Sequence, residues 1–481
     1  MDRIDKAAQL IEHRLQAALC QFIFPFSVIE GCQANLKRRL AEAGFTPFFL
    51  NNLSLEDAYY GEGYRVSHPS MERYYLPYTA SVLFPHELVP DSFQRFSQAL
   101  HLGCELRTKY RRIPFTILSV DVMLCPFDLG FITIRTKLDE ERPDYTTALE
   151  FASRFRSLQD VSAQDDSTVI SCEERLYEQV EEYIFNRLAP AVVPFLDTSE
   201  MKGAYFETLP FFVDEKMYVE AFFAFPEGTE IGDIEQFRAV QLDGVDMDDK
   251  PYISASNMDY IEHYLDRHRY RRWLPGSVYV TNEHSFCCLT SENRGMATRL
   301  ANQMYGQFYY GLLLNLFHKI VLLKLANRHS AIQLEQDHDE IEDLIRSITN
   351  FSAKYFFMEL VSQSQGKEIF LMLRHIFGNN ELFTDVKMTL MDLYKYQDRH
   401  NSKRSNNLLM ILTLYTVIGG IYGMNQVIGD LKGPIAWRRM LHYSFFEYVA
   451  LFLTFTGIPV GFVLAGTVIA RWVKDRRNRR A

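Results

Sequence analysis

Two apolar segments close to the C-terminus are the strongest feature of the hydropathy pattern. The first covers residues 407–422 and the second covers residues 445–470. A helix needs about 20 apolar residues to cross a bilayer, so the second segment is long enough alone. The first reaches that length when the polar residues Ser405 and Asn406 complete it. The pattern predicts two transmembrane helices, at about 406–424 and at 445–471.

Short apolar runs and helical patterns alternate along the first 291 residues. Turn residues between paired runs predict three hairpins: 115–124 with 130–136, 205–213 with 217–225, and 277–281 with 285–290. Helices are expected over 5–19, 92–109, 173–187 and 258–269, and a buried core element over 19–28. The mixture predicts an α+β domain at 1–291, which we expect to be cytosolic and regulatory.

No strand pattern follows residue 292. Helical stretches are expected at about 293–334, 337–377 and from 380 onward, and the last has no Pro or Gly between Glu381 and Ile418. It should therefore run unbroken into the first apolar segment. The predicted parts after 291 are a helical region at 292–378, a long pore-lining helix at 379–425, an external loop at 426–444, and a basic cytosolic tail at 472–481.

Charge sets the expected orientation. Three basic residues precede the first apolar segment, six follow the second, and three lie between them: Arg399, Lys403 and Arg404; Arg471, Lys474, Arg476, Arg477, Arg479 and Arg480; Lys432, Arg438 and Arg439. This excess predicts a multi-pass protein of the plasma (inner) membrane with both termini in the cytoplasm.

The composition also excludes some functions. The formal net charge is -10, although residues 401–481 hold 11 Lys and Arg against three acidic residues. The remainder is therefore strongly acidic, which argues against nucleic acid as a partner. Seven scattered cysteines indicate free thiols in a reducing compartment. No catalytic motif is found, so an enzyme is not expected, nor an organic cofactor.

A stripe of small and polar residues follows one face of the first membrane helix. Its members recur at helical spacing from Asp398 onward, and the pore-lining residues expected among them are Ser402, Ser405, Leu409, Thr413, Thr416 and Gly420. In lipid such a stripe must face another helix or water. It indicates either a narrow wet pore with a constriction at Leu409 or a seam between packed helices.

The segment Tyr422, Gly423, Met424, Asn425 ends the first apolar stretch and resembles the Gly-Met-Asn signature of the CorA family of divalent-cation channels. The resemblance is detailed over residues 380–481. It implies a homopentamer whose long helices line the pore and whose selectivity filter is Gly423, Met424 and Asn425. It also implies that Asn425 holds a hydrated Mg²⁺ at the external mouth, because Mg²⁺ sheds water reluctantly.

One departure from the family concerns the ion. The family continues after the Asn into a loop with Met-Pro-Glu, whereas this chain offers Asp430 as its loop acid, opposed by basic residues. Mg²⁺ is the ion expected, and a Zn²⁺, Co²⁺ or Ni²⁺ transporter of the same family is the near alternative. A ligand-gated membrane effector, with a small cytosolic ligand at the N-terminal domain and secondary ion passage, is the alternative from another class.

The resemblance also implies regulatory metal sites formed by acidic residues that face neighbouring subunits of the cytosolic domain. The residues considered are Asp337, Asp339 and Glu340 in the densest acidic run, and Asp385 and Asp392 one heptad apart on the long helix. The acidic run is equally suited to a solvated helix start. The basic-aromatic run 267–273 could bind an anion or form a surface paired with acids.

Overall fold

The computed structural model describes residues 10–50, 60–61, 63–66, 68–159, 168–197, 216–272, 274–332, 338–357, 359–430, 434, 437–449, 451–452 and 455–456. The chain divides into two compact units, Met1–Met388 and Thr389–Ala481. The helical region that we separated at 292–378 lies in the first unit, together with the sheet.

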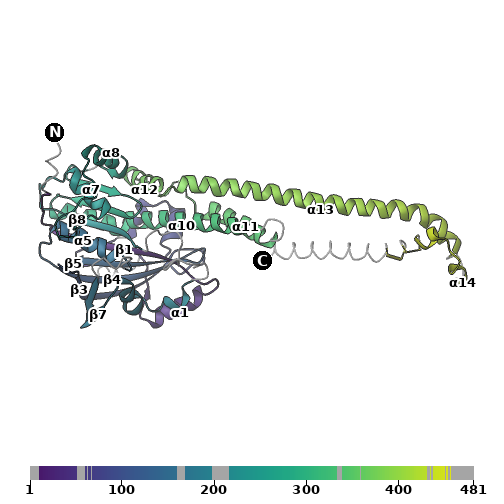
Figure 1. The fold of residues 1–481 in the computed structure, drawn as a ribbon, viewed down its shortest axis with the longest axis horizontal. Coiled ribbons are helices and arrows are strands. Elements are labelled where there is room, and N and C mark those ends of the chain that lie inside the picture. Colours follow the sequence, from purple (N-terminus) through teal and green to yellow (C-terminus); the bar gives the residue numbers. More distant parts are fainter. Residues whose placement is uncertain are drawn as a thin grey trace. The chain divides into compact units, whose positions relative to one another are not determined.

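One mixed, 11-stranded sheet forms the first unit (Figure 1). Its strands are β1 (Ala17–Ser27), β2 (Thr46–Pro47), β3 (Gln94–Arg107), β4 (Arg112–Cys125), β5 (Leu129–Leu138), β6 (Val169–Cys172), β7 (Arg175–Tyr177), β8 (Tyr218–Ala224), β9 (Arg269–Tyr270), β10 (Ser277–Thr281) and β11 (Ser285–Thr290). The order is β7-β6-β3-β4-β5-β1-β8-β11-β10-β9, with β2 beside β3. Neighbours are antiparallel except β8 and β11, which are parallel.

The first strand lies in the middle of the sheet. β1 pairs with β5 on one edge and with β8 on the other. Ten of its 11 residues are buried, which explains its almost unbroken apolar sequence, since a central strand covered on both faces has no solvent side. The core element predicted over 19–28 is confirmed as this strand.

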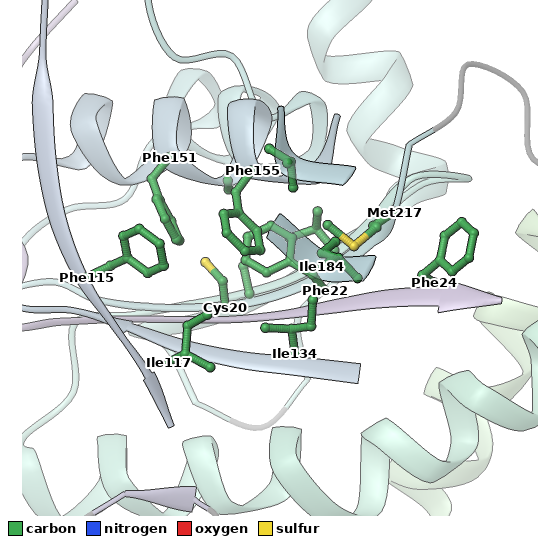
Figure 2. Close-up of a cluster of buried hydrophobic side chains, with 14 of the residues drawn as sticks. Cys20, Phe22, Phe24, Phe115, Ile117, Ile134, Phe151, Phe155, Ile184 and Met217 are labelled. Atoms are coloured by element: carbon green, nitrogen blue, oxygen red, sulfur yellow. The ribbon is translucent and has the colours of Figure 1, made fainter. Parts of the chain in front are cut away.

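Helices cover the sheet on both faces. On one face, Phe151 and Phe155 of α5 (Tyr145–Arg156) contact Phe22 of β1 and Phe115 of β4, with ring centroids 4.6 to 5.7 Å apart (Figure 2). On the other face, the π-helix η6 (Met304–Phe308) and α10 (Tyr309–Ala331) bring tyrosines against β5, where the Tyr309 hydroxyl lies 2.8 Å from that of Thr133. The main core therefore consists of two layers of helix with the sheet between them.

The other helical elements of the first unit are short. They are α1 (Gln33–Glu42), α3 (His68–Tyr74), α4 (Pro77–Leu83), α6 (Val180–Tyr183), the π-helix η3 (Ile184–Leu188), the 3-10 helix η4 (Val193–Phe195), α7 (Asp233–Gln241), α8 (Met258–His268), α9 (Arg294–Gln303), α11 (His338–Lys354) and α12 (Ser364–Ile376). They are followed by α13 (Asn379–Asp430), of 52 residues, and α14 (Trp437–Met440).

Two of the three predicted hairpins are confirmed. β4 pairs with β5 across the expected turn, and β10 pairs with β11 over the predicted bounds. The pairing proposed for 217–225 is wrong, because both edges of β8 are occupied by β1 and β11. Its expected partner, 205–213, lies outside the described residues.

Three predicted helices contain strand residues. The stretch 92–109 contains β3, and the described part of 5–19 has no helix and ends in the first residues of β1. The stretch 173–187 contains β7 before it becomes helical. The helix at 258–269 is confirmed as α8, and the helices after residue 292 are confirmed as α9 to α13, with a break between α11 and α12.

The predicted fold class of two C-terminal transmembrane helices in a CorA-like pentameric channel is contradicted. Within the described residues, one helical stretch is long and apolar enough to cross a membrane, and it is Arg294–Ser330. Its most apolar window is 83% buried within the structure. The first predicted span instead forms part of the much longer α13, and most of the second, 457–471, lies outside the described residues, as does the basic tail.

Candidate functional site

The predicted pore-lining residues all lie on α13. Residues 402, 405, 409, 413, 416 and 420 are placed on one continuous helix and are exposed. A helix repeats every 3.6 residues, so their spacing keeps them on one side of α13. The stripe therefore exists as a surface of this helix; the structure contains one chain, so the function of that surface stays a prediction.

The hydroxyls of the two threonines of the stripe donate hydrogen bonds to backbone carbonyls of the same helix. The Thr413 hydroxyl donates to the Leu409 carbonyl and the Thr416 hydroxyl donates to the Leu412 carbonyl, each at 2.7 Å. A hydroxyl has one proton and two lone pairs. Because the protons are taken, each hydroxyl presents only oxygen lone pairs to its surroundings. Such a surface attracts a cation and offers no donor to an anion.

A second helical segment of this unit, which follows Ser444 and includes Phe452 and Thr456, contacts α13 on a different side from the stripe. The Tyr415 hydroxyl lies 3.3 Å from the Thr456 hydroxyl, which itself donates to the Phe452 carbonyl at 2.7 Å. Tyr415 is therefore the donor in the pair. The segment begins with a cap, since the Glu447 carboxylate accepts from both the backbone N–H and the hydroxyl of Ser444.

Apolar side chains are exposed all around α13. Every residue from 405 to 414 is exposed, which is more than two full helical turns. The exposed fraction is 66% for Met410 and 60% for Leu414. The described part of the following segment adds Phe445, Phe452 and Phe455, each at least 66% exposed. Apolar surface on this scale marks a place that lipid or protein covers.

The predicted filter residues lie close to the end of α13. The helix includes Gly423, Met424 and Asn425 and continues to Asp430. Asp430 is thus the last helical residue, whereas we expected it in a loop that begins at 426. The structure describes the backbone of this stretch alone, so the roles of these side chains stay predictions.

The expected regulatory acids do not gather into one site. Asp392 accepts from Lys395 at 3.2 Å on the helix surface, and Asp385 lies two turns away. Asp339 and Glu340 occupy the first turn of α11, where acids suit the helix dipole. Asp337 lies outside the described residues. Within the residues that the structure describes, no group of three or more His, Cys, Asp or Glu is placed to hold a metal.

The basic-aromatic run at 267–273 forms ion pairs with acidic residues of neighbouring helices. Arg269 donates to Asp233 at 2.6 Å, and Arg272 forms an ion pair with Glu368 of α12. Tyr270 also donates to Glu368 at 2.7 Å. Arg271 also pairs with Asp233, at 3.6 Å. These pairs join β9 and the residues after it to α7 and α12, so three of the arginines of this run already have acidic partners.

A buried cluster of charges was missed by sequence reasoning. Asp121 of β4 is completely buried and forms ion pairs with Arg95 of β3, at 2.9 Å, and with Arg135 of β5. Burial alone would raise the pKa of Asp121, but the two guanidinium groups lower it below its ordinary value. The three residues lie on adjacent strands under η6 and α10, and hydroxyls of Ser97 and Tyr60 complete the contacts.

The same polar band continues across β1 to β8. Gln21 donates to the buried Glu220 at 2.7 Å, and burial raises the pKa of Glu220 well above its ordinary value even though Arg135 opposes this. Register explains why these residues meet: Arg135, Gln21 and Glu220 are direct cross-strand neighbours. No local motif could have shown this, because each residue comes from a different strand.

Comparisons with known proteins leave the site without a relative. No family model, curated protein or solved structure matches this chain.

Proposed function

We propose that the second unit lies in a membrane and that assembled copies of the chain pass a divalent cation along the stripe of α13. The observation that carries the proposal is a ring of six exposed apolar side chains between residues 408 and 414, on the helix that also carries the stripe of cation-attracting hydroxyls. The six are Leu408, Leu409, Met410, Ile411, Leu412 and Leu414. Moving a large apolar side chain from water into an apolar medium gains about 1.5–3 kcal/mol. Six exposed apolar residues within two helical turns therefore favour a non-aqueous environment.

Two features of α13 favour a cation. The threonine hydroxyls present lone pairs, and the sequence at the helix end offers the amide oxygen of Asn425. Neutral oxygens bind Mg²⁺ through its hydration shell, which suits a channel better than carboxylates that hold the ion tightly. Mg²⁺ is the first candidate, and Zn²⁺, Co²⁺ and Ni²⁺ are the alternatives that the flux experiment separates.

The test is cation flux into proteoliposomes that contain the full chain. Asn425→Ala should reduce Mg²⁺ flux by about tenfold or more, as expected when an ion loses one charge-assisted contact per copy. Asn407→Ala is the matched control, because Asn407 is an exposed asparagine of the same helix outside the stripe, and it should keep the flux. Equal flux in wild type and Asn425→Ala would refute the filter, and no flux of any divalent ion would refute the function.

A second pair of variants tests the stripe. Thr413→Val and Thr416→Val keep the shape of the side chains and remove the oxygens. Both should lower cation flux, whereas Thr456→Val, on the segment that contacts Tyr415, should lower it less. Flux that is unchanged by the stripe variants would mean that ions do not follow this face of α13.

A further inference from the structure

A cavity of about 460 Å³ lies in the first unit, and its lining residues include none from α13. It is bounded by α1, by the residues that lead into β3, by the β4–β5 turn, and by α11 with the residues after it. This volume is in the range of small-molecule sites, which is about 300–1,000 Å³. Nothing in the proposed cation path involves this cavity.

The walls of the cavity are held in an unusual backbone conformation. Phe127 and Asp128, in the β4–β5 turn, have φ values of 64° and 51°, and Asp91 has a φ of 62°. Non-glycine residues rarely adopt such values, and they gather at binding sites. Lys324 of α10 donates to the Phe127 carbonyl, and the Val28 N–H donates to the Asp128 carbonyl at 2.8 Å. The turn is therefore fixed before any ligand arrives.

One wall carries a buried acceptor that lacks a donor. Gln94, at the start of β3, is 5% exposed, and its amide nitrogen donates to the Val89 carbonyl at 2.6 Å. That bond fixes which end of the amide is the oxygen. Oε1 is buried and has no hydrogen-bond partner among the described residues. Because solvent does not reach this oxygen, Gln94 is an ordered part of the cavity wall and does not itself contact a ligand.

Helix α1 supplies a positively charged side chain to the same cavity. Lys37 lines the same cavity and is half-buried, and burial lowers its pKa. Within the described part of the chain its ammonium forms no ion pair or hydrogen bond. The carboxylates of the cavity have other neighbours: Asp91 pairs with Lys354 at 3.2 Å, and Asp128 accepts from Gln33 at 3.4 Å. The Lys37 ammonium is thus available to bind an anionic group of a ligand.

We propose that this cavity binds a small zwitterion of the amino-acid type, whose carboxylate meets Lys37 and whose ammonium group lies beside the carboxylates of Asp91 and Asp128. The carboxylates of Asp91 and Asp128 add negative charge that suits the ammonium end. Asn350 of α11 and Tyr355 also line the cavity, so the ligand contacts the sheet and the helical region together.

The experiment measures thermal unfolding of the full chain in detergent. The probes are glycine, L-alanine, L-serine, L-glutamine and L-glutamate at millimolar concentration. At least one should raise the unfolding temperature of the wild type. L-alaninamide and N-acetyl-L-alanine, which each lack one charge, should have a smaller effect than L-alanine. If none of the five amino acids shifts the unfolding temperature, the proposal is overturned.

Variants connect the effect to the cavity. Lys37→Gln should weaken binding of the active amino acid by about 10- to 100-fold, which corresponds to one charge-assisted hydrogen bond. The variant removes a half-buried, unpaired charge, so the protein without ligand should unfold at the same temperature or higher. Arg38→Gln, one position along α1 and outside the cavity, should bind as the wild type does. Undiminished binding by Lys37→Gln would place the ligand elsewhere.

Discussion

Asp121 is a fully buried carboxylate whose charge depends on two buried arginines. Its carboxylate is enclosed between two buried guanidinium groups, and neither arginine reaches solvent. Ion pairs of this kind contribute little net stability compared with apolar residues, but removing one partner leaves the other charges without compensation. The cluster therefore makes the sheet intolerant of change at this position.

Asp121→Asn should reduce the free energy of unfolding by about 3–5 kcal/mol, because it leaves Arg95 and Arg135 buried together without an anion. Denaturant unfolding measures the loss. Asp139→Asn is the control, since Asp139 is exposed and accepts from Thr116; it should cost about 0.5 kcal/mol or less. Equal effects of the two variants would contradict the argument.

His318 is a second buried polar residue with a predictable effect. It lies in α10, donates to the Tyr355 carbonyl at 2.8 Å, and has a pKa that burial lowers to about 3, with Arg374 adding to the effect. In the unfolded chain its pKa is about 6.5. Between these values the unfolded chain binds a proton that the folded chain does not. The free energy of unfolding therefore falls as the pH falls below 6.5, and above it His318 has no effect.

At pH 5 the contribution lost should be roughly 2 kcal/mol. His318→Gln keeps a donor for Tyr355 and cannot titrate, so its stability should change less between pH 7 and pH 5 than that of the wild type. The exposed His263→Gln, on α8, should keep the pH dependence of the wild type. Denaturant unfolding at both pH values gives the comparison, and parallel slopes for all three proteins would argue against this role.

At the scale of elements, local patterns predicted the strands with clear alternation and a turn between them. The β4–β5 and β10–β11 hairpins follow this rule. β3 was misread because Phe93, Phe96 and Leu100 have helical spacing, whereas Leu102, Cys104 and Leu106 repeat every second residue. The position of β8 could not be predicted, because its partners β1 and β11 are set by packing between distant parts of the chain.

For the candidate sites too, features set by local spacing could be predicted from the sequence and contacts between separate elements could not. The stripe of α13 could be read from the sequence, because helical spacing is local. The Arg95, Asp121 and Arg135 cluster and the cavity beside Lys37 and Gln94 could not, since each joins residues from separate elements.

The pairing of two strands also determines where a glycine is required. A Cβ on Gly130 of β5 would lie 2.3 Å from the ring of Phe26, its partner on β1. Gly130→Ala should therefore cost about 1–3 kcal/mol, because the buried ring has to move. Gly103, on β3, has nothing within 4 Å of the corresponding position. Gly103→Ala should be neutral, and thermal unfolding distinguishes the two; a neutral Gly130→Ala would show that the ring adapts freely.

At the scale of the whole molecule, the two units differ in which surfaces they expose. The first unit buries its apolar residues in a core of its own, whereas α13 exposes apolar residues between 405 and 414. This contrast, and the proposed membrane contact, can be tested by truncation after Met388.

A fragment of residues 1–388 should be soluble and monodisperse without detergent, whereas the full chain should sediment with membranes and resist extraction by carbonate. Cell fractionation and gel filtration measure both properties. Leu412→Lys in the full chain serves as a second variant, because a charge at the centre of the apolar stretch costs about 2.5–3.5 kcal/mol on insertion. A full chain that stays in the aqueous fraction would contradict membrane contact.

The central position of β1 has a consequence for how the protein is made. Gln21 and its partner Glu220 are 199 positions apart, and β8 in turn needs β11 at its other edge. During translation β1 emerges before β8 and is therefore left with an open edge while some 200 further residues are added. Folding of the sheet is slow for this reason, since distant pairings must form late. Chaperone occupancy on the ribosome should consequently concentrate on nascent chains that already contain β1 and still lack β8.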